Sequence, residues 1–118
     1  MATTPGKAFY ERQIAYLEKN DVDGLIANQY TPDAQIIGFD FQYKGRDALH
    51  KHFINYMKQL GTIKLQSTDK FAETEDSIFF EATIRVSAGI AQVYDVFILR
   101  NGQATHHFTG LRSFAPNS

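Results

Sequence analysis

An aspartate stands inside one of the most apolar segments of the chain. Asp95 is flanked by Tyr94 and Val96 within the run VYDVFIL, residues 93–99. A carboxyl group among apolar residues needs a hydrogen-bond partner or a chemical function, because burying an unpaired charge is costly. In an apolar pocket such an acid favours its neutral form, which can donate a hydrogen bond to a carbonyl oxygen. The alternative is an aspartate at the rim of a pocket, satisfied by water or by a basic neighbour.

Two adjacent histidines, His106 and His107, follow Asp95 after a tight turn at Asn101-Gly102. The turn predicts a hairpin, so one histidine of the pair shares the face of Asp95. With a two-residue loop this is His106, whereas a three-residue loop that ends in a bulge places His107 opposite Asp95. A histidine beside a carboxylate can take or give a proton near neutral pH. The alternative is that both histidines are structural.

The elements that must position these residues follow from the spacing of apolar side chains. Apolar residues recur every three to four positions in helices and every second position in strands. This rule predicts helices over residues 5–20, 22–30 and 46–60, and strands over residues 35–41, 63–71, 78–86, 91–99 and 103–113. Separate helices followed by consecutive strands indicate an α+β protein, with three helices on one face of a curved antiparallel sheet.

Aromatic and amide side chains are predicted to surround the same cavity. Phe97 lies two residues after the aspartate, on the same strand face, and Gln13 and Tyr16 lie on the inward stripe of the first helix. Tyr30 and Tyr56 come from the other two helices and would place hydroxyl groups at the cavity mouth. Aromatic walls with a few polar groups are typical of small-molecule pockets. Each of these residues is also an ordinary residue for the edge of a core.

Composition and charge exclude several classes of function. The chain has 118 residues, which suits one domain over residues 1–118, and 43% of them are apolar. Its net charge is −1 and its basic residues are scattered, which argues against nucleic-acid and anionic-membrane partners. The absence of cysteine excludes disulfides and thiolate chemistry. There is neither a signal-peptide core nor an apolar run of about 20 residues, so we expect a cytoplasmic protein.

Metal ligation is not favoured by the spacing of the acidic and histidine residues. His50 and His52 are two positions apart and do not face each other on a helix, so we interpret them as solvated. A site made from His107, Asp95 and Asp40 has suitable residue types, but nothing in the spacing favours it over a pair that transfers protons. We therefore predict neither a metal nor a cofactor.

The other face of the predicted sheet is apolar as well. Its outward positions include Phe79, Thr83, Tyr94, Val96 and Ile98. In a monomer these residues would form an apolar patch exposed to water, because the helices already occupy the opposite face. We therefore expect this face to bind a second copy of the chain, most simply in a twofold homodimer.

Three segments of the chain resemble one known superfamily. Residues 20–25 read NDVDGL after the first helix, residues 43–49 read YKGRDAL before the third, and the hairpin begins with YDVF at residues 94–97. These segments resemble the nuclear transport factor two-like superfamily, which includes ketosteroid isomerases and SnoaL-like polyketide cyclases. The resemblance covers nearly the whole chain. It implies a cone-shaped fold, with the helices on the concave face of the sheet, and a homodimer through the outer face.

The resemblance also implies roles for particular positions. Asp95 falls where ketosteroid isomerases keep a protonated aspartate, Gln13 where they keep the oxyanion tyrosine, and Gly38 where they keep the catalytic aspartate. Two of these three positions differ from the family pattern. Asp40 lies two residues after Gly38, so a regular strand would bring its carboxylate to the same cavity. The resemblance also favours the three-residue loop, and with it His107 as the histidine in the cavity.

Three functional hypotheses remain from the sequence. The first is an enzyme that binds a small, partly apolar carbonyl compound and transfers a proton as an isomerase, cyclase or lyase. In it Asp95 holds the oxygen, and Asp40 or His107 moves the proton. The second is a carrier or sensor with the same cavity and no chemistry. The third is an assembly domain, in which only the outer sheet face matters.

Overall fold

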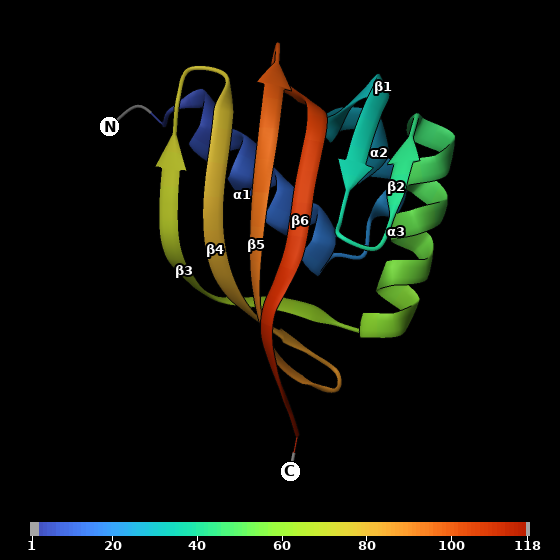
Figure 1. Ribbon diagram of the computed structural model, residues 1–118, viewed down its shortest axis with the longest axis vertical. Coiled ribbons are helices and arrows are strands. Elements are labelled where there is room, and N and C mark those ends of the chain that lie inside the picture. Colours follow the sequence, from blue (N-terminus) through green and yellow to red (C-terminus); the bar gives the residue numbers. More distant parts are fainter. Residues whose placement is uncertain (1–2, 118) are drawn as a thin grey trace.

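Three helices cover one side of a curved six-stranded sheet in the computed structural model, which describes residues 3–117 (Figure 1). The helices are α1 (Pro5–Glu18), α2 (Val22–Gln29) and α3 (Arg46–Leu60). The strands are β1 (Tyr30–Ile37), β2 (Gln42–Lys44), β3 (Ile63–Glu73), β4 (Ser77–Val86), β5 (Gly89–Arg100) and β6 (Gln103–Pro116). Their order in the sheet is β2-β1-β6-β5-β4-β3. The predicted α+β architecture is confirmed.

Local capping explains where the helices begin and end. The Thr4 hydroxyl accepts a hydrogen bond from the Lys7 amide at the start of α1, and an Asp21 carboxylate oxygen accepts one from Gly24 at the start of α2. At the end of α3, Gly61 adopts a φ of 76°, a conformation that favours glycine. All three predicted helix starts are therefore correct, and α1 and α2 end slightly earlier than predicted.

The predicted strand over residues 35–41 is wrong in its bounds. The strand β1 already ends at Ile37, and the chain turns back into β2, which pairs antiparallel with it. The Gly38 amide donates a hydrogen bond to the Phe41 carbonyl (2.9 Å), which closes the turn. The Phe41 ring packs on Gly38 where a Cβ atom would collide with it. The sheet therefore contains a strand, β2, that the alternation of apolar residues did not reveal.

The strand β1 also departs from the expected antiparallel order. It pairs parallel with β6, and the pairing is irregular between Tyr30 and Gln35. Pro32 lies in this irregular part. Proline has no amide hydrogen, and here no regular hydrogen bond between the two strands requires one. The second helix was predicted to extend to Tyr30, whereas α2 ends at Gln29 and Tyr30 is the first residue of the strand.

The hairpin of β5 and β6 has a register that neither expected loop provides. Its loop has two residues, Asn101 and Gly102, with φ values of 53° and 78°. A bulge then follows, because Leu99 pairs with Ala104 but Ile98 pairs with His106, which leaves an additional residue in β6. This extra residue reverses the side-chain parity that the short loop alone would give.

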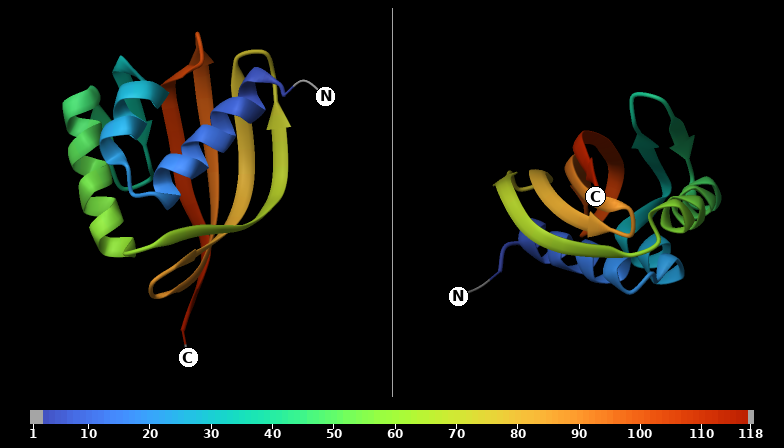
Figure 2. Two further views of the ribbon diagram at one scale, coloured as in Figure 1. Left: turned by 180° about the vertical axis from the view of Figure 1, so that it is seen from behind. Right: turned by 90° about the horizontal axis from the view of Figure 1, so that it is seen from below.

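The helices pack on the sheet through large aromatic side chains. Phe9 and Tyr10 of α1 are buried. The ring centroid of Phe9 lies 4.9 Å from that of Phe97, and the ring centroid of Tyr10 lies 4.5 Å from that of Phe80. The helix α1 runs diagonally across the strands, and α3 lies at the β1–β2 end of the sheet, with α2 packed against both helices (Figure 2). No helix among the described residues is long and apolar enough to cross a membrane.

Candidate functional site

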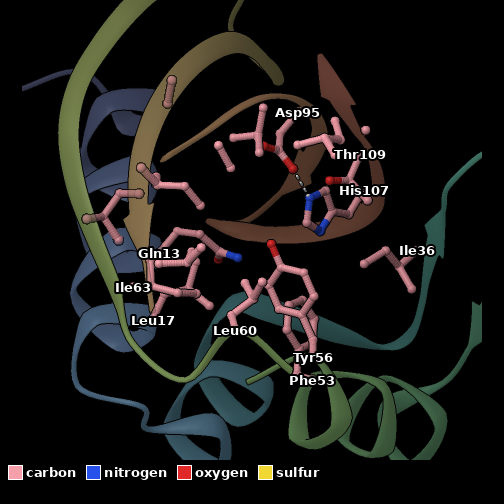
Figure 3. A pocket seen from close by; sticks show the side chains of 18 of the residues that line it. Gln13, Leu17, Ile36, Phe53, Tyr56, Leu60, Ile63, Asp95, His107 and Thr109 are labelled. Carbon is pink, nitrogen blue, oxygen red and sulfur yellow. Dashed lines mark hydrogen bonds and ion pairs between the residues drawn. The ribbon is translucent and has the colours of Figure 1, made fainter. Parts of the chain in front are cut away.

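A cavity of about 310 Å³ lies between the sheet and the helices (Figure 3). Its walls come from α1, α3 and every strand except β2, together with Phe41 in the turn between β1 and β2, and most of the side chains in them are apolar. The volume lies at the lower end of the range of small-molecule pockets. Figure 3 shows a few polar side chains that approach this space from different elements: Gln13 from α1, Tyr56 from α3, and Asp95, His107 and Thr109 from the sheet.

Asp95 and His107 form a buried pair on one wall of the cavity. The Asp95 Oδ1 atom lies 2.7 Å from His107 Nε2, and the side chains are only 13% and 5% exposed. His107 pairs with Phe97 in the hairpin register, so it lies on the cavity face, diagonally next to Asp95. The ring of Phe97 stacks on the imidazole, with centroids 3.9 Å apart. His107, rather than His106, is thus the histidine beside the aspartate, as the resemblance suggested, although Thr109 stands directly opposite Asp95.

A layer of buried polar side chains supports this pair from behind. The Tyr30 hydroxyl lies 2.9 Å from His107 Nδ1 and accepts a hydrogen bond from the Gln13 amide at 3.1 Å. Tyr30 is fully buried and contacts the site without lining the cavity. Burial raises the pKa of Tyr30 well above its usual value, so its hydroxyl remains protonated.

Tyr56 presents a hydroxyl group to the cavity from α3. Figure 3 shows this hydroxyl directed toward the space in front of His107. Burial raises the pKa of Tyr56, and the negative charge of Asp95 adds to the increase. The phenol is therefore a hydrogen-bond donor at neutral pH, and it belongs to the helix that the sequence analysis expected to supply it.

Besides Tyr30, two further predicted site residues do not line the cavity. Asp40 is exposed in the turn between β1 and β2, because the strand that should have carried it ends at Ile37. Tyr16 lies between α1 and α2 on the outside, where its hydroxyl accepts a hydrogen bond from Asn28 at 2.9 Å. Neither residue is among those that line the cavity, so the trio of Asp40, Asp95 and His107 is not assembled.

His52 and Phe41 are aromatic residues that line the cavity and that the sequence did not assign to it. His52 was interpreted as solvated, but it is half-buried and stacks on Phe41 with ring centroids 4.8 Å apart. Burial lowers the pKa of His52, and the nearby His107 contributes to the decrease. Its position four residues before Tyr56 was the available signal, since residues at this spacing share a helix face. Phe41 was missed because its orientation depends on the turn at Gly38.

Comparisons with known proteins identify the fold. No family model matches the chain, and no curated protein matches it. The structure resembles that of TerC co-crystallised with polyporic acid, at a TM-score of 0.76 and 16% sequence identity, covering 92% of each chain. It resembles a nuclear transport factor two-like protein of unknown function from Burkholderia pseudomallei, at a TM-score of 0.77 and 19% identity, again covering 92% of each chain. A candidate polyketide cyclase from Sinorhizobium meliloti has a TM-score of 0.75 and 13% identity, over 87% of this chain and 94% of that one. The chain therefore has the nuclear transport factor two-like fold, as its sequence resemblance implied.

Proposed function

We propose that this protein binds a small, largely apolar carbonyl compound and transfers a proton on it, as an isomerase, cyclase or lyase that needs no cofactor. The observation that carries the proposal is the Asp95–His107 pair, buried on the wall of an apolar cavity. Groups that titrate at a pocket wall and contact each other are the usual components of general acid–base catalysis.

The surroundings of the pair support this reaction class. Proton removal next to a carbonyl group develops negative charge on the carbonyl oxygen, which a hydrogen-bond donor in a dry site stabilises strongly. The Tyr56 hydroxyl is such a donor, and its high pKa keeps it protonated. The apolar walls favour a ligand whose remaining surface is hydrocarbon.

The comparisons support a small-molecule ligand without identifying it. TerC was crystallised with polyporic acid, and another protein of similar structure was assigned as a polyketide cyclase. Proteins of one fold often differ in function, so these names suggest compounds to test rather than a substrate.

The alternative is a carrier or sensor that binds a similar ligand without chemistry. By the resemblance, Gly38 occupies the position at which ketosteroid isomerases keep their catalytic aspartate. Here the Phe41 ring fills the space beside Gly38, so no carboxylate replaces that base, and this favours a carrier. The cytoplasmic location expected from the sequence stays a prediction.

Hydrogen–deuterium exchange separates the two functions without a known substrate. The protein is incubated in D₂O with a panel of small apolar ketones, enones and quinones, and exchange at carbons next to the carbonyl group is followed by NMR. We expect accelerated exchange for at least one compound and a loss of about 10²-fold or more in Asp95→Asn, because the variant cannot accept the proton.

The matched control is Asp40→Asn, which removes an exposed carboxylate outside the cavity and should leave the exchange rate unchanged. Binding of a compound by the wild-type protein, seen as thermal stabilisation, with no accelerated exchange in any case would instead support the carrier.

We also propose that a second copy of the chain covers the outer sheet face. Five mutually paired positions form an apolar row across β3, β4, β5, β6 and β1: Ala72, Phe79, Val96, Phe108 and Ile37. Phe79 and Phe108 are 49% and 41% exposed. The row crosses the side of the sheet opposite the cavity, so a homodimer would leave the site intact.

A further inference from the structure

A chain of hydrogen bonds connects the protein surface with the Asp95–His107 pair. The exposed Arg12 donates from Nε to Gln29 Oε1 at 3.0 Å, and Gln29 Nε2 donates to Gln13 Oε1 at 3.1 Å. Gln13 Nε2 then donates to the Tyr30 hydroxyl, which lies 2.9 Å from His107 Nδ1. The side chains of Gln13, Gln29 and Tyr30 are buried, so protein groups alone must satisfy them.

The direction of this chain is determined at its outer end. Arg12 can only donate hydrogen bonds, and the main-chain carbonyl of Phe9, which receives the second hydrogen of Gln29 Nε2 at 3.1 Å, can only accept one. The reverse orientation of the Gln29 amide would place donor against donor at Arg12 and acceptor against acceptor at Phe9. Gln29 must therefore present its NH₂ group to Gln13.

The same reasoning extends to the histidine. Since Gln13 Oε1 accepts from Gln29, its NH₂ group faces Tyr30 and donates to the phenol oxygen. The hydrogen of the Tyr30 hydroxyl then has one acceptor among the described residues, His107 Nδ1. A ring nitrogen that accepts a hydrogen bond carries no hydrogen, so the neutral imidazole must carry it on Nε2, which points at Asp95 Oδ1.

We infer that Arg12, Gln29, Gln13 and Tyr30 hold His107 in the tautomer with its hydrogen on Nε2. Asp95 is then the residue that exchanges a proton with the ligand, and His107 is a positioning residue. The tautomer stands on the hydrogen-bond geometry alone, whereas the assignment of Asp95 rests on the proposed function. It changes the roles expected from the sequence, in which Asp95 held the oxygen and Asp40 or His107 moved the proton.

The corresponding reaction balances without any co-reactant. The free carboxylate oxygen of Asp95 takes a proton from a carbon next to the ligand carbonyl, and the C–H electron pair forms a C=C bond. The carbonyl π pair moves to the oxygen, where the Tyr56 hydroxyl can donate a hydrogen bond. As the C=O bond re-forms, Asp95 returns the proton in one of two ways. Protonation at the far carbon of a C=C bond conjugated with the enolate moves that double bond and gives an isomer. Protonation of a hydroxyl group on the β carbon, whose C–O bond breaks as a new C=C bond forms, gives water and a lyase product.

The first test is the tautomer in the unmodified protein. In ¹⁵N-labelled protein near neutral pH, long-range ¹H–¹⁵N correlation spectra distinguish protonated from unprotonated ring nitrogens in each of the four histidines. The His107 signals are assigned from their loss in His107→Asn. We expect Nδ1 unprotonated and Nε2 protonated. A hydrogen on Nδ1, whether alone or with one on Nε2, would overturn the inference.

The second test reverses the direction of these hydrogen bonds by replacing one amide NH₂ group with an oxygen atom. In Gln29→Glu the carboxylate cannot donate to Gln13, so the Gln13 amide turns, Tyr30 donates to it, and His107 Nδ1 must carry a hydrogen. Gln13→Glu leads to the same outcome by a different position, should the first variant fail to fold. We expect a protonated Nδ1 in either variant.

The matched control is Tyr16→Phe, which removes a hydrogen bond between the same two helices at a surface position. It should leave both ring nitrogens of His107 as in the wild-type protein. If both Gln29→Glu and Gln13→Glu fold and also keep Nδ1 unprotonated, the hydrogen bonds from Arg12 to Tyr30 do not set the tautomer. These spectra need no ligand, so they test the tautomer independently of the reaction. If the tautomer is as expected but no compound shows accelerated deuterium exchange, the proposed reaction is rejected and the tautomer is not.

Discussion

At the scale of single residues, the site depends on small changes in the chain near β1. Gly38 has room for the Phe41 ring, and this ring becomes part of the cavity wall. Any larger residue at this position competes with Phe41 for the same space. The glycine at position 38 therefore allows Phe41 to form part of the cavity wall. Asp40 lies outside the cavity, so it cannot replace the catalytic aspartate that ketosteroid isomerases keep, by the resemblance, at the position of Gly38.

This competition predicts the stability of Gly38→Ala. Its Cβ atom would collide with the Phe41 ring, so we expect the free energy of unfolding to decrease by about 1–3 kcal/mol. In the Phe41→Ala background the same change should cost less than about 0.5 kcal/mol, because the obstructing ring is absent. Urea unfolding of the four proteins measures both values. Equal costs in the two backgrounds would contradict the packing argument.

At the scale of elements, α3 connects the core with the cavity. Its buried face carries Leu49, Phe53 and Met57, and its neighbouring face carries His52 and Tyr56 to the cavity wall. The helix therefore places an ionisable imidazole in a partly dry position, which should make the stability of the fold depend on pH.

The expected sign follows from the lowered pKa of His52. In the unfolded chain the imidazole binds a proton below its ordinary pKa of about 6.5, but the folded state resists protonation. The stabilising contribution is therefore present above about pH 6.5 and is lost as the pH falls toward the lower pKa of the folded protein. In His52→Phe, the free energy of unfolding should fall less between about pH 7 and pH 5 than in the wild-type protein.

Urea unfolding at several pH values checks this prediction. The control is His50→Gln, which removes an exposed histidine of the same helix that pairs with Asp23. If the wild-type protein and His52→Phe lose stability in parallel as the pH falls, His52 is not the group responsible.

At the scale of the whole molecule, the two faces of the sheet differ in what covers them. The helices and the cavity occupy the concave face, whereas the apolar row from Ala72 to Ile37 crosses the other one. Tyr94 also lies on this outer face, where its ring covers Gly110 of the neighbouring strand. Phe79 and Phe108 are thus better probes of a dimer interface than Tyr94.

We expect a wild-type dimer that Phe79→Lys or Phe108→Lys weakens by about 2 kcal/mol or more, roughly 30-fold in its dissociation constant. A lysine in the centre of an apolar interface must lose its hydration. Sedimentation velocity over a range of concentrations measures the change. Phe39→Lys is the control, because Phe39 is 90% exposed in a turn outside the row. A wild-type protein that is monomeric throughout would contradict the proposal.

Features that depend on neighbouring residues could be predicted from the sequence. Apolar periodicity predicted the helix starts at Pro5, Val22 and Arg46, and alternation predicted the four long strands after α3. The unusual position of Asp95 also directed attention to the correct wall of the cavity. These signals are local, so one sequence is enough to detect them.

Which side chains contact each other could be seen only in the folded protein. The face of His107 depends on an additional residue in the β6 bulge, which changes side-chain parity and has no strong signature in the sequence. The exclusion of Asp40 depends on a turn that the Phe41 ring stabilises. The hydrogen bonds from Arg12 to His107 join four elements, α1, α2, β1 and β6, and their direction follows from donors and acceptors that lie up to 77 positions apart in the chain. Such contacts are set by packing and by the pairing of buried polar groups, which no local pattern encodes.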